Sequence, residues 1–360
     1  MASPSAAHPI AVIGAGIIGA SVAYHLARAG APPLIVDAGD GGGVTTPTSW
    51  AWLNASWGNP EPYVRLRRRS IAEWHRLASE LPALPIHFRG SLTADISADE
   101  LNIYVERYGA WGYRLRLVDC DEIMRREPRL REAPAVAALC EEEGAVEPVA
   151  AAVRLREAAV ALGARFLPRT SVHRLVLTGD SVTGLDIGDE VVAIRAAVCA
   201  AGVAAPDLMR QAGYMLPFET PEGLLAHTQV FEPVISSLLV LPGIHVRQTT
   251  EGRLVAGFDF AGSTIDAPAV AAAQLITRIN ELITLPKPAR LDFMTIGLRP
   301  TPGDGFPVIG WVPGWKGLYL TVMHSGMTLA PAVGLFAAEE ILSSRRDPLL
   351  APYGPERFRN

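Results

Sequence analysis

A glycine-rich turn between an apolar run and a helical repeat is the feature that most restricts how this chain can fold. Residues 10–13 are all apolar, GAGIIG follows at residues 14–19, and apolar residues then recur at helical spacing. A second apolar run, residues 34–36, ends at Asp37, which lies 18 positions after Gly19. Short runs of this kind are typical of parallel strands that are covered on both faces. The order strand, glycine turn, helix, strand and acid predicts one βαβ unit.

Each part of this turn has a physical reason to bind a dinucleotide. Gly14 permits the tight turn, Gly16 lets the backbone approach a pyrophosphate, and Gly19 lets the helix pack closely on the strand. The first helical turn presents N–H groups and the positive end of the helix dipole to phosphate, with Ala15 and Ile18 as candidate contacts. The acid that ends the second strand can accept hydrogen bonds from a ribose and would repel a 2′-phosphate. These residues predict nucleotide binding and leave FAD and NAD open.

The composition excludes several classes of function. The chain has 360 residues, of which 49% are hydrophobic, so it can form about two domains with a large core. Its 32 basic and 37 acidic residues give a net charge of −5, which offers no footprint for nucleic acid or an anionic membrane surface. No apolar stretch reaches the roughly 20 residues that a membrane-spanning helix needs. A small molecule is therefore the expected partner.

Other local features are expected to have no functional role. The densest basic run, Arg65 with Arg67 to Arg69, has a helical setting and is interpreted as a solvated face. Cys120, Cys140 and Cys199 form an odd set without CxxC spacing, which argues against a disulfide framework or a zinc ribbon. The eight histidines show no HExxH or close paired spacing, so no metal site is expected. The start of the chain does not resemble a signal peptide, and together with the cysteines this predicts a cytoplasmic location.

A glycine- and hydroxyl-rich loop, residues 39–49, stands where a simple NAD domain would usually continue to its next helix. Trp50, Trp52 and Trp57 come directly after it. A surface linker is the alternative, but linkers of this composition seldom carry three tryptophans in eight positions. The loop is therefore predicted to wrap the flavin side of a cofactor. Its candidate contacts are Thr46, Thr48 and Ser49.

Further segments resemble the family of D-amino acid oxidases and glycine oxidases, and the resemblance extends over nearly the whole chain. Residues 143–163 open with EGAVEP and continue as a helix. AVCAAG at residues 197–202 is similar to the family's second cofactor strand, although the usual tryptophan after the glycine is absent. Residues 297–310 contain GLRP and DGFPVIG, which resemble the family's arginine-bearing strand and the turn after it. A strand at residues 318–322 and a helix beginning near Met327 complete the match.

The resemblance implies an α/β fold of two interleaved parts. One is a Rossmann-like FAD-binding domain with the glutathione-reductase type of nucleotide fold, built from residues 1–85, 145–215 and 295–360. The other is an α+β substrate domain on an antiparallel sheet, built from residues 86–144 and 216–294. FAD is the implied cofactor.

The resemblance also implies how FAD is held. Val172 is expected in a strand under the adenine, with a core role as the alternative. Gly326, Met327 and Thr328 open a helix whose N–H groups can stabilise negative charge around flavin N1 and the C2 carbonyl. No cysteine follows Cys199 and no histidine lies in residues 45–57, so noncovalent FAD is expected. The implied contacts are Val172, Ala201, Gly202, Gly326, Met327 and Thr328.

The arginine of GLRP, Arg299, is the implied substrate anchor, and it is also a candidate contact of the cofactor. A guanidinium makes two parallel hydrogen bonds to a carboxylate, whereas an ion pair with Asp304 is the structural alternative. The implied reaction moves a hydride from the carbon beside a neutral amine nitrogen to flavin N5, and the imine hydrolyses after release. Oxygen or another acceptor then reoxidises the flavin. A dehydrogenase with a different acceptor, a noncatalytic FAD-binding subunit of an amine-oxidising complex and an NAD-linked dehydrogenase are the alternatives, and substrate identity and oligomeric state stay open.

Two histidines are further candidates for the active site. A hairpin at residues 244–260 is expected to roof the flavin, with His245 where relatives commonly carry a tyrosine and Arg247 as a weaker candidate. His324 precedes the last helix. It is expected either to stabilise charge during oxygen reduction as an imidazolium or to bond the backbone at a turn.

Overall fold

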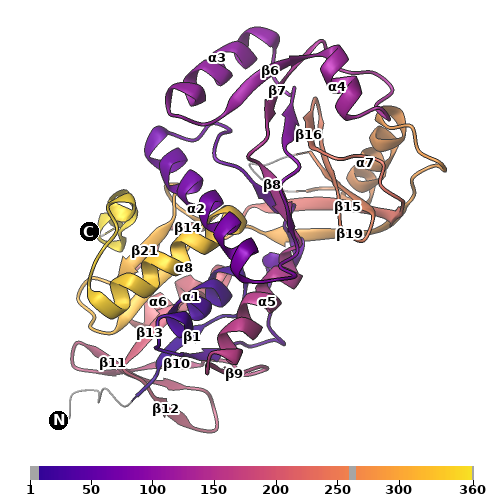
Figure 1. Ribbon diagram of the computed structural model, residues 1–360. Coiled ribbons are helices and arrows are strands. Elements are labelled where there is room, and N and C mark those ends of the chain that lie inside the picture. Colours follow the sequence, from indigo (N-terminus) through magenta and orange to yellow (C-terminus); the bar gives the residue numbers. More distant parts are fainter. Residues whose placement is uncertain (1–7, 259–264, 359–360) are drawn as a thin grey trace.

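The computed structural model describes residues 8–258 and 265–358, which form two large sheets in different parts of the molecule (Figure 1). The strands of the first sheet are β1 (Ile10–Ile13), β2 (Leu34–Val36), β9 (Arg165–Leu167), β13 (Ala196–Cys199), β21 (Val308–Trp311) and β22 (Leu318–Val322). They lie in the order β21-β22-β13-β1-β2-β9. All neighbours are parallel except β21 and β22.

Both faces of this sheet are covered. One face carries helices, namely α1 (Ile17–Arg28), α2 (Glu61–Glu80), α5 (Pro148–Ala161) and α8 (Gly326–Ser343). The other carries β10 (Arg174–Thr178), β11 (Ser181–Asp186), β12 (Val191–Ala193) and α6 (Ala205–Gln211). α1 packs against both α5 and α8, and α2 packs against α8 (Figure 1). Ile10 and Val12 belong to the helix-side core while Ala11 and Ile13 belong to the opposite core, which explains why the run is continuously apolar.

The second sheet has eight strands and supports the other part of the molecule. Its strands are β5 (Ser91–Thr93), β6 (Leu115–Asp119), β7 (Val136–Cys140), β15 (Glu222–Val230), β16 (Leu238–Leu241), β17 (Ile244–Gln248), β18 (Arg253–Gly257) and β19 (Leu291–Leu298). They lie in the order β19-β15-β18-β17-β16-β5-β7-β6. Among the described residues of this sheet, β16 and β5 form the only parallel pair, and all other neighbours are antiparallel. The helices α3 (Ala98–Ala110), α4 (Cys120–Arg126) and α7 (Pro268–Leu282) pack on it (Figure 1).

Short elements connect the two parts. β3 (Trp52–Leu53) and β4 (Ile86–His87) pair with β8 (Gly144–Val146), so the chain that follows the glycine-rich loop is tied to the segment before α5. β14 (Phe218–Glu219) pairs with β20 (Thr301–Pro302). This architecture confirms the expected α/β class with a parallel sheet and a second, largely antiparallel sheet.

One local expectation differs from the structure, and two others stay predictions. Val172 lies in an extended segment directly before β10 and not within a strand, because the pairing with β11 begins only at Arg174. β18 ends at Gly257, and Phe260, the expected end of the hairpin, lies outside the described residues. β19 runs through the expected boundary after residue 294, and the division into domains stays a prediction.

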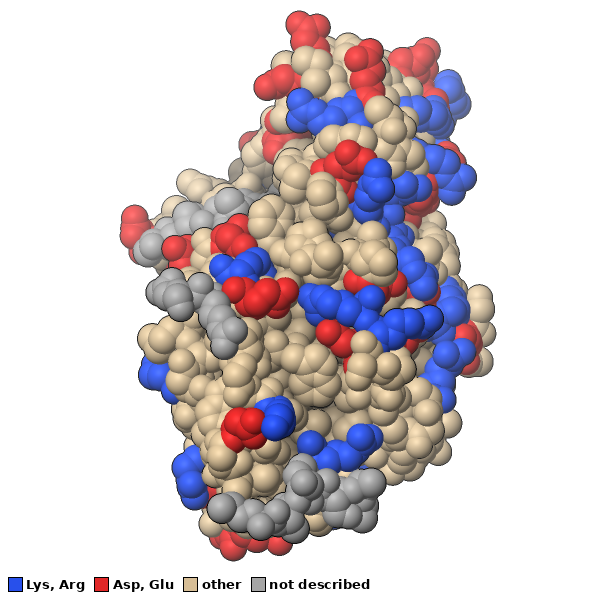
Figure 2. Space-filling model, turned by 90° about the vertical axis from the view of Figure 1, so that its left-hand side faces the viewer, with Lys and Arg blue, Asp and Glu red and all other residues tan. Residues whose placement is uncertain are grey.

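The surface carries charges of both signs. Figure 2 shows Lys and Arg interspersed with Asp and Glu on one face. Many of these charges form ion pairs, such as Arg65 with Glu61 and Arg116 with Glu122. Among residues 8–258 and 265–358, every helix is too short or too polar to cross a membrane.

Candidate active site

One cavity of about 1110 Å³ is lined by residues of both sheets. Part of its wall lies at the carboxyl ends of β1, β2 and β13, which is where α/β sheets bind their ligands. Another part comes from β15, β17 and the residues after β19. Pockets for small molecules typically measure about 300–1,000 Å³. The cavity therefore has room for a large cofactor together with a small substrate.

The glycine turn forms a cradle in which side chains have no space. Gly14 has a φ of +101°, and a Cβ there would lie 2.5 Å from a neighbouring carbonyl oxygen. A Cβ on Gly19 would lie 1.9 Å from the carbonyl oxygen of Gly14. A Cβ on Gly16 would lie 3.3 Å from Thr46 Oγ1, which accepts a hydrogen bond from the Ile17 N–H. This cradle fits a pyrophosphate that approaches the backbone closely.

Asp37 is fixed at the edge of the cavity by two backbone hydrogen bonds. Its Oδ2 accepts from the Ala15 N–H at 2.6 Å, and its Oδ1 accepts from the Gly39 N–H at 2.8 Å. A carboxylate has about four acceptor sites, so capacity for ribose hydroxyls remains. The Ala15 N–H is engaged within the protein, and this residue, like Gly19, does not line the cavity. Ala15 and Gly19 therefore support the turn on the side that faces away from the cavity.

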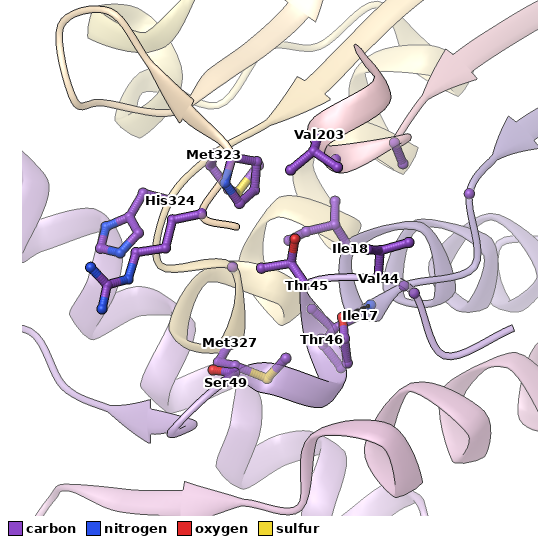
Figure 3. A pocket seen from close by; sticks show the side chains of 18 of the residues that line it. Ile17, Ile18, Val44, Thr45, Thr46, Ser49, Val203, Met323, His324 and Met327 are labelled. Atoms are coloured by element: carbon purple, nitrogen blue, oxygen red, sulfur yellow. Dashed lines mark hydrogen bonds between the residues drawn. The ribbon is translucent and has the colours of Figure 1, made fainter. Parts of the chain in front are cut away.

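The structure brings together almost all of the residues that the sequence singled out. Figure 3 shows Ile17 and Ile18 at the start of α1, the loop threonines Thr45 and Thr46, and Met327 around one space. The predicted residues that line the cavity are Gly14, Gly16, Ile18, Asp37, Thr46, Thr48, Ser49, Val172, Ala201, Gly202, His245, Arg299, His324, Gly326, Met327 and Thr328.

The first turn of α8 reaches the cavity beside α1. Gly326 lies so close to α1 that a Cβ there would contact Ile18 at 3.5 Å. The Thr328 hydroxyl donates a hydrogen bond to the Trp52 carbonyl oxygen at 3.0 Å, which ties this turn to β3. N–H groups in a first helical turn have no acceptor within their own helix. The positive end of the α8 dipole is therefore directed to the part of the cavity that Trp52 also lines.

Arg299 enters the cavity directly after β19. Its backbone N–H donates to the Pro221 carbonyl oxygen at 3.0 Å. Its guanidinium lies over Gly223, where a Cβ would come within 2.5 Å of Nη2. The alternative ion pair with Asp304 is wrong, because that carboxylate pairs with Arg357 at 2.7 Å.

His245 and His324 are neutral imidazoles. Burial, followed by the charge of Arg299, lowers the pKa of His245 to about 3. Burial, followed by the charges of Arg299 and Arg67, lowers the pKa of His324 to about 4. His245 also packs edge-on against Trp50, with ring centroids 4.6 Å apart. The imidazolium expected as one role of His324 is disfavoured by this environment.

Arg247 is a structural residue, and its side chain does not line the cavity. Its Nε donates to the Trp50 carbonyl oxygen at 2.7 Å, and its guanidinium pairs with Glu147 at 3.2 Å. All five residues of β17, including Arg247, are buried. Arg247 therefore holds the backbone of Trp50 in place.

Arg67 is a cavity residue that the sequence interpretation assigned to a solvated face. Its side chain is buried, its Nε donates to the Asn54 carbonyl oxygen at 2.8 Å, and its guanidinium lies over the ring of Tyr63. A signal was present in the sequence. Tyr63, Arg67, Ile71 and Trp74 recur at helical spacing, so Arg67 lies on the apolar face of α2.

Glu143 is a second feature that sequence reasoning missed. Its buried carboxyl group accepts hydrogen bonds from Trp52 Nε1 at 2.6 Å, Ser91 Oγ at 2.5 Å and the Tyr113 hydroxyl at 2.6 Å. Burial raises the pKa of Glu143 to about 7. The carboxyl group therefore holds Trp52, a wall of the cavity, from behind.

Stability is expected to depend on pH through Glu143. A carboxyl group whose pKa is raised in the folded state stabilises the fold at low pH, and this contribution is lost as the pH rises through about 7. The free energy of unfolding of the wild type relative to Glu143→Gln should thus fall by up to about 3 kcal/mol between pH 5 and pH 8. The melting temperature of the wild type relative to this variant should fall with it. Differential scanning fluorimetry at both pH values tests this. An unchanged difference would contradict the buried, proton-binding carboxyl group.

The structure offers little for metal or thiol chemistry. Within the described part of the chain, no group of three or more His, Cys, Asp or Glu side chains could hold a metal ion. Cys120 is exposed, and the buried Cys140 and Cys199 do not line the cavity. Burial also raises the pKa of Cys199 to about 12, so its thiol is inert.

Comparisons with known proteins identify the family. The family model DAO, FAD dependent oxidoreductase, matches residues 9–340. The glycine oxidase of Bacillus licheniformis is 27% identical over 344 residues, with 92% of each chain covered. An opine oxidase subunit of Agrobacterium tumefaciens is 24% identical, with 96% of each chain covered. The crystal structure of glycine oxidase from Geobacillus kaustophilus superposes with a TM-score of 0.86 at 25% identity and covers 98% of this chain and 99% of its own.

The family match and the geometry agree on the cofactor. The match spans both the glycine cradle and the first turn of α8, and these two features line one cavity. The chain therefore belongs to the DAO family of FAD-dependent oxidoreductases, and FAD is its cofactor.

Proposed function

We propose that this enzyme oxidises the C–N bond of a small amino acid or N-alkyl amino acid, whose carboxylate is bound by Arg299, and that oxygen is the electron acceptor. The position of Arg299 is the main support. Its guanidinium comes from the second sheet and lines the same cavity as the glycine cradle and the start of α8. A guanidinium in such a site binds a planar carboxylate through two parallel hydrogen bonds.

The side chains of the cavity would bind and orient the substrate rather than react with it. When bound, FAD supplies the hydride acceptor, flavin N5. Arg299 would fix the carboxylate, and His245 and His324 can accept hydrogen bonds from the amine because both are neutral. The N–H groups at the start of α8 would stabilise negative charge in the cavity. Orientation of the reacting carbon is then the principal contribution of the protein.

The charge of the site favours the neutral amine that this reaction needs. Arg299 lowers the pKa of both cavity histidines, so its field disfavours a further positive charge nearby. An ammonium group held between these histidines would experience the same field. The substrate amine is therefore expected to lose its proton more readily in the cavity than in water.

The names of the relatives agree with an amino acid substrate, since two of them are glycine oxidases. Another relative is named as a subunit of an opine oxidase, and this name favours keeping a subunit of a larger amine-oxidising complex as the second candidate. Anaerobic mixing of the purified holoenzyme with a panel of amines and amino acids separates the two. Bleaching of the flavin by an amino acid, followed by hydrogen peroxide formation in air, supports an oxidase. A flavin that no amine reduces supports the second candidate.

Noncovalent FAD is a prediction that can be tested directly. No cysteine lines the cavity among the described residues, and no histidine occurs in residues 45–57. Acid precipitation should release all yellow colour into the supernatant and leave a polypeptide of unmodified mass. A yellow pellet with an added mass of one flavin would show a covalent bond.

A further inference from the structure

Arg67 is a buried cation for which the proposed reaction has no role. Its side chain lines the cavity and is 4% exposed. Its Nε and Nη2 donate to the carbonyl and side-chain oxygens of Asn54, and its guanidinium lies 5.1 Å above the ring of Tyr63. These contacts are all with neutral groups. No acidic side chain within residues 8–258 and 265–358 forms an ion pair with Arg67.

Two neighbouring arginines of α2 have acidic partners, whereas the half-buried Arg68 donates to the Trp111 carbonyl oxygen. Arg65 pairs with Glu61, and Arg69 pairs with Glu73. Both of these arginines are far more exposed than Arg67, so they need a counter-ion less. A buried charge that lacks a counter-ion is costly unless a ligand provides one. Arg67 therefore points to an anionic group that enters the cavity from outside the chain.

The substrate is the anion that fits this position. Arg67 and Arg299 line one cavity with His324, and the charges of both arginines act on that histidine. The two guanidinium groups thus border a common space. The pyrophosphate of the cofactor has its own cradle at the glycine turn, where backbone N–H groups provide the positive potential. With one carboxylate on Arg299, Arg67 still has no ion-pair partner among the described residues, although its charge acts on the buried carboxyl group of Glu143.

We propose that Arg67 binds a second carboxylate of the substrate, so that this enzyme prefers amino acids with two carboxylates. The second carboxylate is carried either on the side chain or on an N-alkyl group. This inference rests on the proposed function, because it assumes that Arg299 takes the first carboxylate. Asn54 would position Arg67, since its two oxygens hold the guanidinium.

Binding of unreactive acids tests the proposal without turnover. Acetate and propionate serve as monocarboxylate probes and malonate, succinate and glutarate as dicarboxylate probes, each titrated into the holoenzyme while flavin absorbance is followed. The wild type should bind its best dicarboxylate on the order of 30-fold or more tightly than the monocarboxylates, as expected for a buried charge pair. Arg67→Gln should remove this preference. Asn54→Asp, which places a carboxylate on Arg67, should also remove it with little change in shape.

Arg65→Gln is the matched control, because it removes the same charge from an exposed position of the same helix. It should leave the preference intact. The proposal fails if the wild type binds both kinds of acid equally, or if the preference survives in both variants. It also fails if both variants lose FAD or lose affinity for all acids alike, since Arg67 would then serve the cofactor or a single carboxylate.

Reduction by amines distinguishes this proposal from the proposed function and locates the second carboxylate. N-methylglycine, iminodiacetate, aspartate and glutamate are compared in anaerobic bleaching of the flavin. Faster bleaching by iminodiacetate supports a carboxylate on the N-alkyl group, whereas faster bleaching by aspartate or glutamate supports one on the side chain. If no amine bleaches the flavin while dicarboxylates still bind preferentially, the proposed function fails and the second anion site stands.

Discussion

Arg299→Lys is expected to reduce the efficiency of anaerobic flavin reduction by on the order of 30-fold or more while FAD is retained. Lysine keeps the positive charge but lacks the planar fork that holds a carboxylate in one orientation. Disruption of a buried, hydrogen-bonded charge pair costs about 2–5 kcal/mol. Stopped-flow measurement of flavin bleaching against substrate concentration separates weaker binding from slower reaction. Arg299→Ala should lose at least as much, because it also leaves the substrate carboxylate without a counter-ion.

Arg290→Lys provides the matched control for this experiment. Arg290 is exposed directly before β19, the strand that carries Arg299 at its other end. Its replacement should leave both the rate and the concentration dependence unchanged. If Arg299→Lys and Arg299→Ala also bleach like the wild type, or if the best substrate has no carboxylate, Arg299 is not the anchor. Its role would then be confined to packing over Gly223.

Gly16→Val is expected to produce a folded protein that purifies without FAD. The backbone of Gly16 has φ −68° and ψ −178°, which valine adopts readily, so the change adds little backbone strain. The added side chain would lie against Thr46 and Gly43 at the cradle, where it takes the space of the pyrophosphate. Flavin absorbance relative to protein absorbance measures the retained cofactor, and circular dichroism verifies the fold.

Gly109→Val is the matched control for the cradle. Gly109 lies in α3, and a Cβ there would meet nothing within 4 Å. This variant should retain stoichiometric FAD, because the side chain has space and valine is a better helix former than glycine. A Gly16→Val protein with a normal spectrum and stoichiometric FAD would falsify the assignment of the pyrophosphate to this turn.

The nucleotide end of the site could be predicted from the sequence because its determinants are local. A strand, a glycine turn and a helix are contiguous in the chain, and the carboxylate of Asp37 follows at the end of the next strand. The positions of Gly14 and Gly19 follow from backbone geometry, which a sequence pattern records directly. The same holds for the first turn of α8, where the residues from Gly326 onward form one helix end.

The substrate end could be predicted only in part. Arg299 is identified through the resemblance of GLRP to a family motif. Its alternative partner, Asp304, is wrong, because Asp304 pairs instead with Arg357, which lies 53 positions away in the chain and could not be recognised from a local pattern. Arg247 was a candidate for the cavity, yet it is buried against Glu147. Such pairings depend on which distant segments meet, and no local pattern records them.

The sequence by itself determined the βαβ unit and its nucleotide site, because both depend on a contiguous motif. FAD and the arginine that enters the cavity followed from the resemblance of several segments to a known family. Helical spacing already places Arg67 on the apolar face of α2, but the tertiary structure alone decided that it lines the cavity. The tertiary structure alone also decided that Glu143 is buried behind Trp52, which raises the pKa of its carboxyl group. It also decided that His324 is neutral. Burial and electrostatic fields arise from atoms that many segments bring together, and burial determines both the pKa of a side chain and the cost of an uncompensated charge. A helical pattern can therefore place an arginine on one face of a helix, but only the fold decides whether that face lines a cavity.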